Sequence, residues 1–413
     1  MSKNHLGLAP TDPRRRALLA GTASAAAAVG LAAVGGNALA QAAAPATPAG
    51  AKPLPTYVAW KDPSAMIVHS GNTVETKRSA FGTSVITPSD QLYIRNNLPP
   101  PSDEIVADRD AWEISIEGVK NPRKLTVGEL KKMGLATTAM VLQCSGNGRG
   151  YFPSKPSGTQ WTVGAAGCVI WSGVPVRDVV KALGGVEDGM AYMTSTGGEK
   201  LPEGLDPTTV MVERSVPTAA MEDALLAWEL NGEPLPLAHG GPLRVVVPGF
   251  TGVNSVKYAK RLAFTKQQSP AKIQQTSYRF SKPGESGKPS DPSIWEMEPK
   301  SWINSPLPED KDLKTGPVVI SGVAMGGMHA AAKVEVSTDG GATWKAAHFI
   351  GPDLGRYAWR EFALETKLSA GSHMLASRVT DTKGTVQPEE RVDNTRGYSN
   401  TSWRDHAVQV TVA

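Results

Sequence analysis

Cysteine is scarce in this chain of 413 residues, which contains only Cys144 and Cys168. The sequence has no C-x-x-C-H motif for covalent c-type haem, no C-x-x-C pairs for zinc and no cysteine set for an iron–sulfur cluster. The two cysteines could form a disulfide in an oxidising compartment, but a chain of this length can bury two cores without one. Internal repeats are absent as well.

An excess of one charge sign is also lacking. The formal net charge is +4, and residues 1–40 hold four Lys and Arg side chains against one Asp, so the rest of the chain carries about +1. This balance gives no support to nucleic-acid binding. A hydrophobic fraction of 40% and a charged fraction of 20% are typical of a soluble globular protein.

The N-terminus has the pattern of an export signal. Arg14, Arg15 and Arg16 precede an alanine-rich apolar stretch that ends in A-L-A at Ala40. This predicts a twin-arginine signal peptide over residues 1–40, and hence a periplasmic protein exported already folded. The cleavage site argues against a membrane anchor. Residues 41–56, rich in Ala and Pro, are expected to form a flexible leader.

Residues 57–285 mix strand and helix patterns, which predicts an α+β domain. Residues 112–119 alternate like a strand, 126–133 and 174–183 have the pattern of short helices, and 243–250 that of a buried strand. The segment 223–232 fits either a helix or a strand. Residues 281–300, rich in Pro, Gly and Ser, are expected to cross to a second domain.

The second domain, residues 286–413, is expected to be all-β. Strand-like runs occupy residues 317–325, 332–350, 372–381 and 406–413, and Asp339-Gly340-Gly341 marks a hairpin turn. Strands without helices at such spacing predict an immunoglobulin-like β-sandwich.

The stretch "VLQCSGNGRGYFP", residues 141–153, is unusual for a buried cysteine. An apolar lead-in ends at Cys144, and the Ser, Gly and Asn residues after it permit close backbone approach or positive φ. This predicts a sulfur presented at a strand end to a bulky ligand. A loop that merely contains a cysteine is the alternative.

Motifs along the mature chain resemble, in order, those of the sulfite oxidase family of molybdenum enzymes. They are "YIRNNLPPP" (93–101), "LQCSGNGR" (142–149), "TQWTVGAAGCVIWSGVPV" (159–176), "LLAWELNGEPLPLAHGGPLRVVVPGFTGVNSVKY" (225–258), "STDGGATW" (337–344) and "NTRGYSNTSW" (394–403). The resemblance implies a molybdopterin domain followed by a β-sandwich dimerisation domain.

By this resemblance, Cys144 is the thiolate ligand of molybdenum, which favours soft sulfur donors. Arg95, Arg149 and Arg396 correspond to the family's anion pocket, where fixed guanidinium groups suit a compact oxyanion. Trp161 corresponds to a wall of that pocket and Tyr278 to the active-site tyrosine. Cys168 has no motif around it and is expected to be a buried small side chain.

Contacts with the pterin also carry over to this chain. The positions implied are Tyr93, Arg95, Asn96, Asn97, Asp206, His239, Arg244, Ser255, Val256 and Lys257. Two residues depart from the family pattern: Asn97 replaces a frequent histidine and cannot carry charge, and Trp228 replaces a tyrosine and is expected to pack.

The function implied is the oxidation of sulfite to sulfate at a molybdenum–molybdopterin centre. Since this chain has no haem motif, electrons are expected to pass to an external c-type cytochrome, and the enzyme is expected to be a homodimer without a membrane anchor. The alternative within the fold is a sulfane dehydrogenase subunit that acts on carrier-bound sulfur. A related methionine sulfoxide reductase is disfavoured because it lacks the sandwich. A non-catalytic secreted binding protein would contain no molybdenum.

Overall fold

The computed structural model describes residues 52–82 and 84–413. The predicted signal peptide, and the predicted leader as far as residue 51, lie outside the described residues. Residue 54, in the last part of that leader, packs against a hydrophobic cluster that contains Val58, Val74 and Ile94. Within the described residues, no helix is both long and apolar enough to span a membrane.

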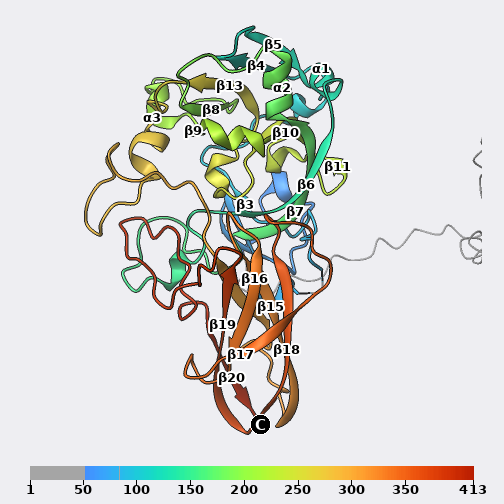
Figure 1. Ribbon diagram of the computed structural model, residues 1–413, viewed down its shortest axis with the longest axis vertical. Helices are drawn as coiled ribbons and strands as arrows, with labels where there is room; N and C mark the ends of the chain where they lie inside the picture. Colours follow the sequence, from blue (N-terminus) through green and yellow to red (C-terminus); the bar gives the residue numbers. More distant parts are fainter. Residues whose placement is uncertain (1–51, 83) are drawn as a thin grey trace, which may run out of the picture. The chain divides into compact units, whose positions relative to one another are not determined.

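Three sheets build the first domain (Figure 1). A three-stranded sheet has the order β1 (Met66–Ser70), β2 (Thr73–Thr76) and β3 (Ile94–Arg95). A second sheet has the order β11 (Glu233–Pro234), β10 (Leu225–Leu230), β7 (Ala166–Pro175) and β6 (Ala136–Gln143), with β12 (Arg244–Val246) also paired to β10. A third has the order β5 (Arg123–Thr126), β4 (Glu113–Glu117), β13 (Ala259–Thr265), β8 (Tyr192–Gly197) and β9 (Glu213–Pro217).

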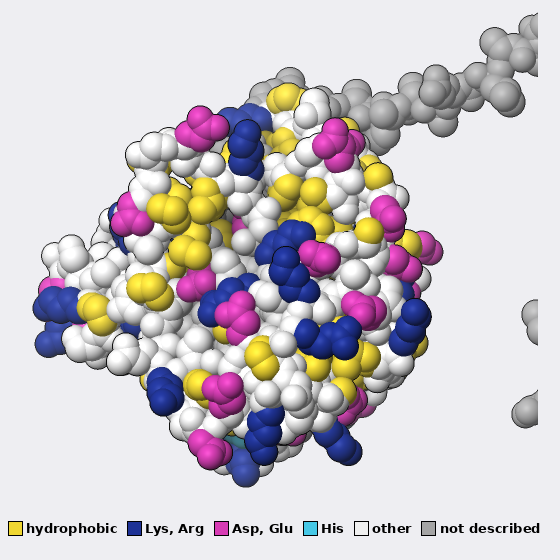
Figure 2. Space-filling view, turned by 90° about the horizontal axis from the view of Figure 1, so that it is seen from above, with side chains coloured by type: hydrophobic (Ala, Val, Ile, Leu, Met, Phe, Trp, Pro, Cys, Tyr) yellow, Lys and Arg dark blue, Asp and Glu magenta, His cyan; other side chains and the backbone are white. Residues whose placement is uncertain are grey.

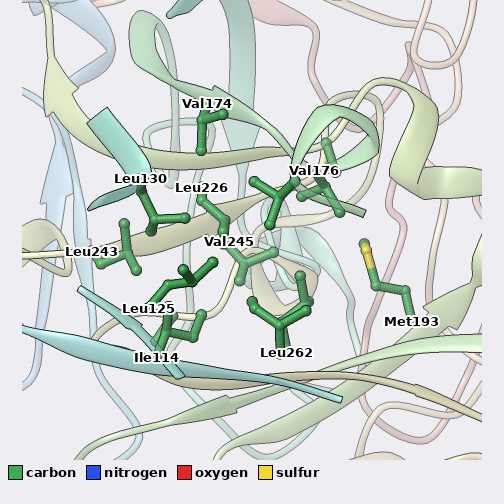
Figure 3. Close-up of a cluster of buried hydrophobic side chains, with 14 of the residues drawn as sticks. Ile114, Leu125, Leu130, Val174, Val176, Met193, Leu226, Leu243, Val245 and Leu262 are labelled. Atoms are coloured by element: carbon green, nitrogen blue, oxygen red, sulfur yellow. The ribbon is translucent and has the colours of Figure 1, made fainter. Parts of the chain in front are cut away.

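The two five-stranded sheets share one hydrophobic core. Side chains of β10 and β12, including Leu226 and Val245, meet those of β4 and β13, including Ile114 and Leu262 (Figure 3). These four side chains are completely buried. Burial of such aliphatic side chains on both faces supplies the main driving force for this arrangement.

Two short helices, α1 (Val127–Lys131) and α2 (Val176–Ala182), bury side chains in this core. A third short helix, α3 (Pro207–Val210), contains no buried residue. Thr126 and Glu129 form a reciprocal capping box at the start of α1, which satisfies two backbone donors there. The helix predictions for 126–133 and 174–183 are therefore confirmed in place and type. The ambiguous segment 223–232 is a strand, β10.

The second domain is all-β, as expected. Its seven strands follow the order β14 (Lys300–Ser305), β15 (Gly316–Met325), β18 (Arg360–Leu368), β17 (Lys345–Ile350), β16 (Ala331–Ser337), β19 (Gly371–Asp381) and β20 (Val408–Val412). Figure 1 shows these strands gathered in orange and red. The first strand of the path approaches the last but one, since Ser301 Oγ in β14 lies 2.9 Å from Ser377 Oγ in β19.

Strand β18 was not among the predicted strands. Its residues Phe362, Leu364 and Leu368 are buried, whereas Glu365 and Lys367 are exposed. The charged and apolar faces alternate as in a half-buried strand, but Glu, Lys and Ala are depleted in strands, so the composition does not favour one. The immunoglobulin-like classification of this domain stays a prediction.

The described surface mixes charges of both signs. In Figure 2, Lys and Arg side chains are interspersed with Asp and Glu over the face shown. This is the pattern of an ordinary solvated surface.

Candidate active site

Cys144 stands directly after the last paired residue of a long hairpin. β6 and β7 pair without interruption as far as Gln143 and Ala166. The Cys144 amide then donates to the Ala165 carbonyl at 2.8 Å, and the Asn147 amide donates back to the Cys144 carbonyl at 2.9 Å. The cysteine therefore begins a tight turn at a strand end, which confirms this part of the sequence prediction. It is 8% exposed and unpaired with Cys168.

The glycines near Cys144 make room for an arginine. A Cβ added to Gly158 would lie 2.8 Å from Arg149 Nη1, and one added to Gly397 would lie 2.9 Å from Arg149 Cγ. A Cβ on Gly146 would collide with the same guanidinium group. Gly148 has φ of +89°, which favours glycine. The small residues thus serve the placement of Arg149 as well as the turn.

Two cavities meet at Cys144. The inner cavity is lined by His239, Arg244 and Lys257, and the outer cavity is lined by Arg149 and Arg396. The residues that line both cavities are Arg95, Asn96, Asn97, Cys144 and Tyr278. A metal bound to Cys144 would therefore face a ligand in the inner cavity and a substrate that enters through the outer one.

Buried cations line the inner cavity without a hydrogen-bonded carboxylate among the described residues. Arg244 donates to the carbonyls of Ser255 (3.0 Å) and His239 (2.9 Å). Lys257 donates to Asn96 Oδ1 (2.7 Å) and to the carbonyl of residue 238 (2.6 Å). Burial lowers the pKa of Arg244 to about 10, and burial together with Arg244 holds the pKa of Lys257 well below its usual range.

These unpaired cations fit the phosphate of a molybdopterin. Buried positive charge is costly unless an anion balances it, and no protein anion is hydrogen-bonded to Arg244 or Lys257 within the described chain. The soft thiolate donor Cys144 fits the metal. The predicted pterin contacts Tyr93, Asn97, His239, Ser255 and Val256 also line this cavity.

Lys61 holds His239 in one protonation state. Its ammonium donates to the carbonyls of Ser89 (2.8 Å) and Leu92 (2.6 Å) and lies 3.1 Å from His239 Nε2. Because an ammonium only donates, Nε2 must accept. Burial lowers the pKa of Lys61 to about 7, and burial followed by the charge of Lys61 keeps the pKa of His239 well below normal. His239 is therefore neutral.

Glu199 lies in the wall of the inner cavity and was not predicted from the sequence. Burial raises the pKa of its carboxyl group to about 7 despite the nearby charge of Lys257. Neither Lys61 nor Glu199 lies in a motif, so no local signal marked them.

The outer cavity brings together the three predicted arginines. Arg95, Arg149 and Arg396 all line it. Arg149 is 6% exposed, and it donates from Nε to the Arg396 carbonyl at 2.7 Å and from Nη1 to the Thr159 carbonyl at 3.0 Å. Arg396 donates to Ser157 Oγ at 3.1 Å. The C-terminal segment therefore completes a cavity whose remaining walls belong to the first domain.

The Arg95 side chain is oriented by the two residues that follow it in the sequence. Its guanidinium donates to the Asn96 carbonyl and, at 2.6 Å, to Asn97 Oδ1. Asn97 therefore helps to orient the Arg95 side chain, and it also lines the inner cavity. An amide oxygen fixes the planar guanidinium without adding charge.

Tyr278 caps a short π-helical turn, Ile273–Ser277, and faces both cavities. Its ring stacks on that of Tyr398, and the guanidinium carbon of Arg214 lies 5.5 Å from its centroid. Arg214 is fully buried, and burial lowers its pKa to about 9. Neither Tyr398 nor Arg214 was a predicted site residue.

Two predicted residues lie elsewhere. Trp161 is completely buried and packs edge-on against Tyr93 (6.3 Å) and His69 (5.0 Å), and it lines neither cavity. Asp206 is exposed and caps α3 by accepting from the Thr208 amide at 2.9 Å. Its capping role explains the carboxylate at that position and places it outside the inner cavity. Trp228 is buried in the core of the first domain, as expected.

Comparison with known proteins agrees with this geometry. Residues 100–273 match the oxidoreductase molybdopterin binding domain, and residues 291–412 match the Mo-co oxidoreductase dimerisation domain. Sulfite oxidase from Gallus gallus is 32% identical over 340 residues, which cover 77% of this chain and 72% of that protein. The chain belongs to the sulfite oxidase family. It therefore contains a molybdopterin-binding domain, as the motifs predicted.

Other relatives show how far the family likeness reaches. Mitochondrial sulfite oxidase from Macaca fascicularis is 32% identical over 350 residues, 79% of this chain, and the chain spans 62% of that relative's length. The sulfane dehydrogenase SoxCD from Paracoccus pantotrophus has a similar structure, with a TM-score of 0.69, 26% identity and coverage of 84% of this chain and 89% of that chain.

Proposed function

We propose that this protein oxidises sulfite to sulfate and delivers the electrons to an external c-type cytochrome in the periplasm. The observation that carries the proposal is the convergence of Arg95, Arg149 and Arg396 on the outer cavity, beside Cys144 and Tyr278. Three fixed guanidinium groups fit a compact dianion that is free to diffuse in. The similarity of the chain to sulfite oxidases supports this substrate.

The balanced reaction is sulfite plus water to sulfate, two protons and two electrons. The molybdenum centre, when bound, supplies oxygen transfer to sulfur and accepts the electron pair. Cys144 would hold the metal, and Arg244, Lys257 and His239 would hold the pterin at the inner end of the site. The arginines would bind and orient the anion, and the Tyr278 hydroxyl faces the cavity where protons are released.

A second candidate substrate is sulfur attached to a carrier protein, with this chain as the sulfane dehydrogenase subunit of a complex. The structural similarity to SoxCD favours it. The openness of the outer cavity and the exposure of Arg396 at its mouth are compatible with a carrier arm. The retained set of three arginines favours the free dianion instead.

One experiment separates the two candidates. Molybdenum-loaded protein would be mixed with sulfite and ferricyanide, and then with a carrier protein bearing a cysteine persulfide. Rapid sulfite-dependent reduction supports the proposed function. Oxidation of carrier sulfur without oxidation of sulfite contradicts it and selects the second candidate. The experiment is repeated with c-type cytochromes in place of ferricyanide to test the acceptor. If sulfite and this protein reduce none of them, a direct haem partner is excluded.

We also propose export through the twin-arginine route and a homodimer. The arginine run and cleavage site of residues 1–40 support the export, and the match to a dimerisation domain supports the dimer. Fractionation of cells that lack the twin-arginine translocase tests the first proposal, and light scattering during gel filtration tests the second. Cytoplasmic accumulation in the wild-type host or a monomeric mass would contradict them.

A further inference from the structure

A buried lysine from the second domain reaches the turn that carries Cys144. Lys300 is the first residue of β14 and is 1% exposed. Its ammonium donates to the Asn147 carbonyl at 3.3 Å, and the Asn147 amide is the one bonded to the Cys144 carbonyl. The cation therefore contacts the turn that carries the proposed metal ligand, and it lines neither cavity.

Lys300 has more donors than the described protein satisfies. An ammonium carries three N–H groups, and the Asn147 carbonyl is its only hydrogen-bond partner within residues 52–82 and 84–413. Such a side chain is rarely left buried without a reason, because desolvation of an unpaired ammonium is costly. Burial lowers the pKa of Lys300 to about 7, with Asp405 and Cys144 opposing the shift and Arg78 adding to it.

Unsatisfied acceptors adjoin the same turn. Asn147 Oδ1 and His406 Nε2 are both buried and have no hydrogen-bond partner in the described part of the chain. His406 Nδ1 lies 2.6 Å from the Ser402 carbonyl, so Nδ1 carries the proton and Nε2 is left as an acceptor. A Cβ on Gly148 would lie 3.0 Å from Nε2, which places His406 against the residue after Asn147.

The donors and acceptors match one another. Spare ammonium donors and unpartnered buried acceptors are groups that buried water commonly satisfies. His406 is neutral, since burial and then Lys300 hold its pKa well below normal. The carboxylate whose charge acts most on Lys300 is that of Asp405, which accepts from Arg391 at 2.9 Å and 3.0 Å.

We propose that Lys300 is a positioning residue for the metal centre, a cation behind the Cys144 turn that sets the reduction potential of the bound molybdenum. Each electron that the centre accepts makes it more negative, and a nearby cation in a water-poor site stabilises the reduced state. Arg391 donates to Asp405, and the charges of Lys300 and Cys144 act on each other. The inference rests on the molybdenum centre of the proposed function, but on neither candidate substrate.

The test is a redox titration of the molybdenum-loaded protein, followed through the Mo(V) electron paramagnetic resonance signal. In Lys300→Met, we expect reduction to be at least tenfold less favourable, which corresponds to a shift of about 59 mV to lower potential for one electron. Lys300→Arg keeps the charge and is expected to titrate like the wild type. Lys260→Met is the control, since Lys260 lies over the Trp112 ring at 3.4 Å in β13, outside the residues that line the site.

Lys300→Gln provides a second neutral variant, which retains a hydrogen-bond donor toward Asn147 if the methionine disturbs folding. Unchanged potentials in both neutral variants, or equal shifts in Lys300→Arg and Lys300→Gln, would overturn the inference, because either result would show that the charge is not what matters. The titration uses chemical mediators and needs no sulfite. A wild-type protein that titrates normally but does not oxidise sulfite would contradict the proposed function alone, and the Lys300 comparison would still decide the inference.

Discussion

Tyr278 and Tyr398 stack nearly face to face, with ring centroids 5.1 Å apart and an angle of 14° between their planes. The first follows a π-helical turn of the molybdopterin domain, and the second follows Arg396 near the C-terminus. The guanidinium carbon of Arg214 lies 5.5 Å from the Tyr278 centroid, and that of Arg149 lies 5.3 Å from the Tyr398 centroid. A predicted catalytic residue is thus held by a residue 120 positions further along the chain.

Replacement of Tyr398 should separate stacking from hydrogen bonding. Tyr398→Phe loses the hydrogen bond from its hydroxyl to the Ser277 carbonyl (3.1 Å) but keeps the stack, so kcat/KM for sulfite should change little. Tyr398→Ala loses the ring and its cation–π contact, together about 1–3 kcal/mol. We expect a fall in kcat/KM of about tenfold, measured by ferricyanide reduction. Equal losses in the two variants would show that the stack does not support catalysis.

Arg149→Gln should act mainly on KM. The substitution removes one charge-assisted contact with the anion, worth about 1.5–3 kcal/mol, so KM for sulfite should rise about tenfold or more. The gap left among Gly146, Gly158 and Gly397 is small, so the fold should persist. Steady-state kinetics at several sulfite concentrations gives the split between kcat and KM.

The matched control is Arg177→Gln, since Arg177 is exposed and pairs only with surface groups near α2. Its KM should equal that of the wild type. An unchanged KM in Arg149→Gln would remove this arginine from the anion site.

The two cysteines should respond oppositely to substitution. Cys144→Ser replaces the soft thiolate donor, so we expect loss of turnover by about a thousandfold or more, with a changed Mo(V) spectrum even where the pterin is retained. Cys168→Ala removes a side chain that is fully buried and whose pKa burial raises to about 12. That variant should keep its activity and lose about 1 kcal/mol of stability. Metal analysis and sulfite turnover of both variants provide the measurement, and an active Cys144→Ser protein would overturn the ligand assignment.

Local patterns accounted for the metal-ligand turn and most of the fold. The apolar run into Cys144 and the small residues after it mark a strand end and a turn, and the structure confirms both. Strands of two residues, such as β3 and β11, are too short to show a period. β18 was missed because Glu365, Lys367 and the other Glu and Ala residues of this segment are of types that are depleted in strands.

The support of the site was hidden from the sequence for a different reason. Lys61 and His239 are separated by 178 positions, and Lys300 and Asn147 by 153. No local motif specifies such pairs, and lysine is ordinarily a surface residue. Asp206 shows the reverse error, because a carboxylate beside Pro207 is equally well explained as a helix cap.

Asn97 should matter through Arg95. Asn97→Ala removes the amide oxygen that accepts from the guanidinium at 2.6 Å, so Arg95 loses one of two restraints. We expect KM for sulfite to rise about three- to tenfold, in line with the loss of one hydrogen bond to a charged group of about 1 kcal/mol or more. Asn97→Asp should restore the acceptor but neutralise part of the positive field, so anion binding should stay weak. Wild-type kinetics in Asn97→Ala would show that Arg95 is fixed without it.

Glu199 should make the cofactor-free protein less stable as the pH rises. Its folded pKa is about 7 against an ordinary value of 4.5, because burial disfavours the carboxylate. Between these values the folded protein holds a proton that the unfolded chain has released, so the free energy of unfolding falls as the pH rises from about 4.5 to 7. The loss from this group is up to about 3 kcal/mol, and it is complete above pH 7.

Urea denaturation at pH 5, 6, 7 and 8 should show this fall in the wild type and a flatter profile in Glu199→Gln. Glu203→Gln, at an exposed position, should follow the wild type. Parallel profiles for the wild type and Glu199→Gln would show that Glu199 is ionised in the cavity throughout, paired with Lys257.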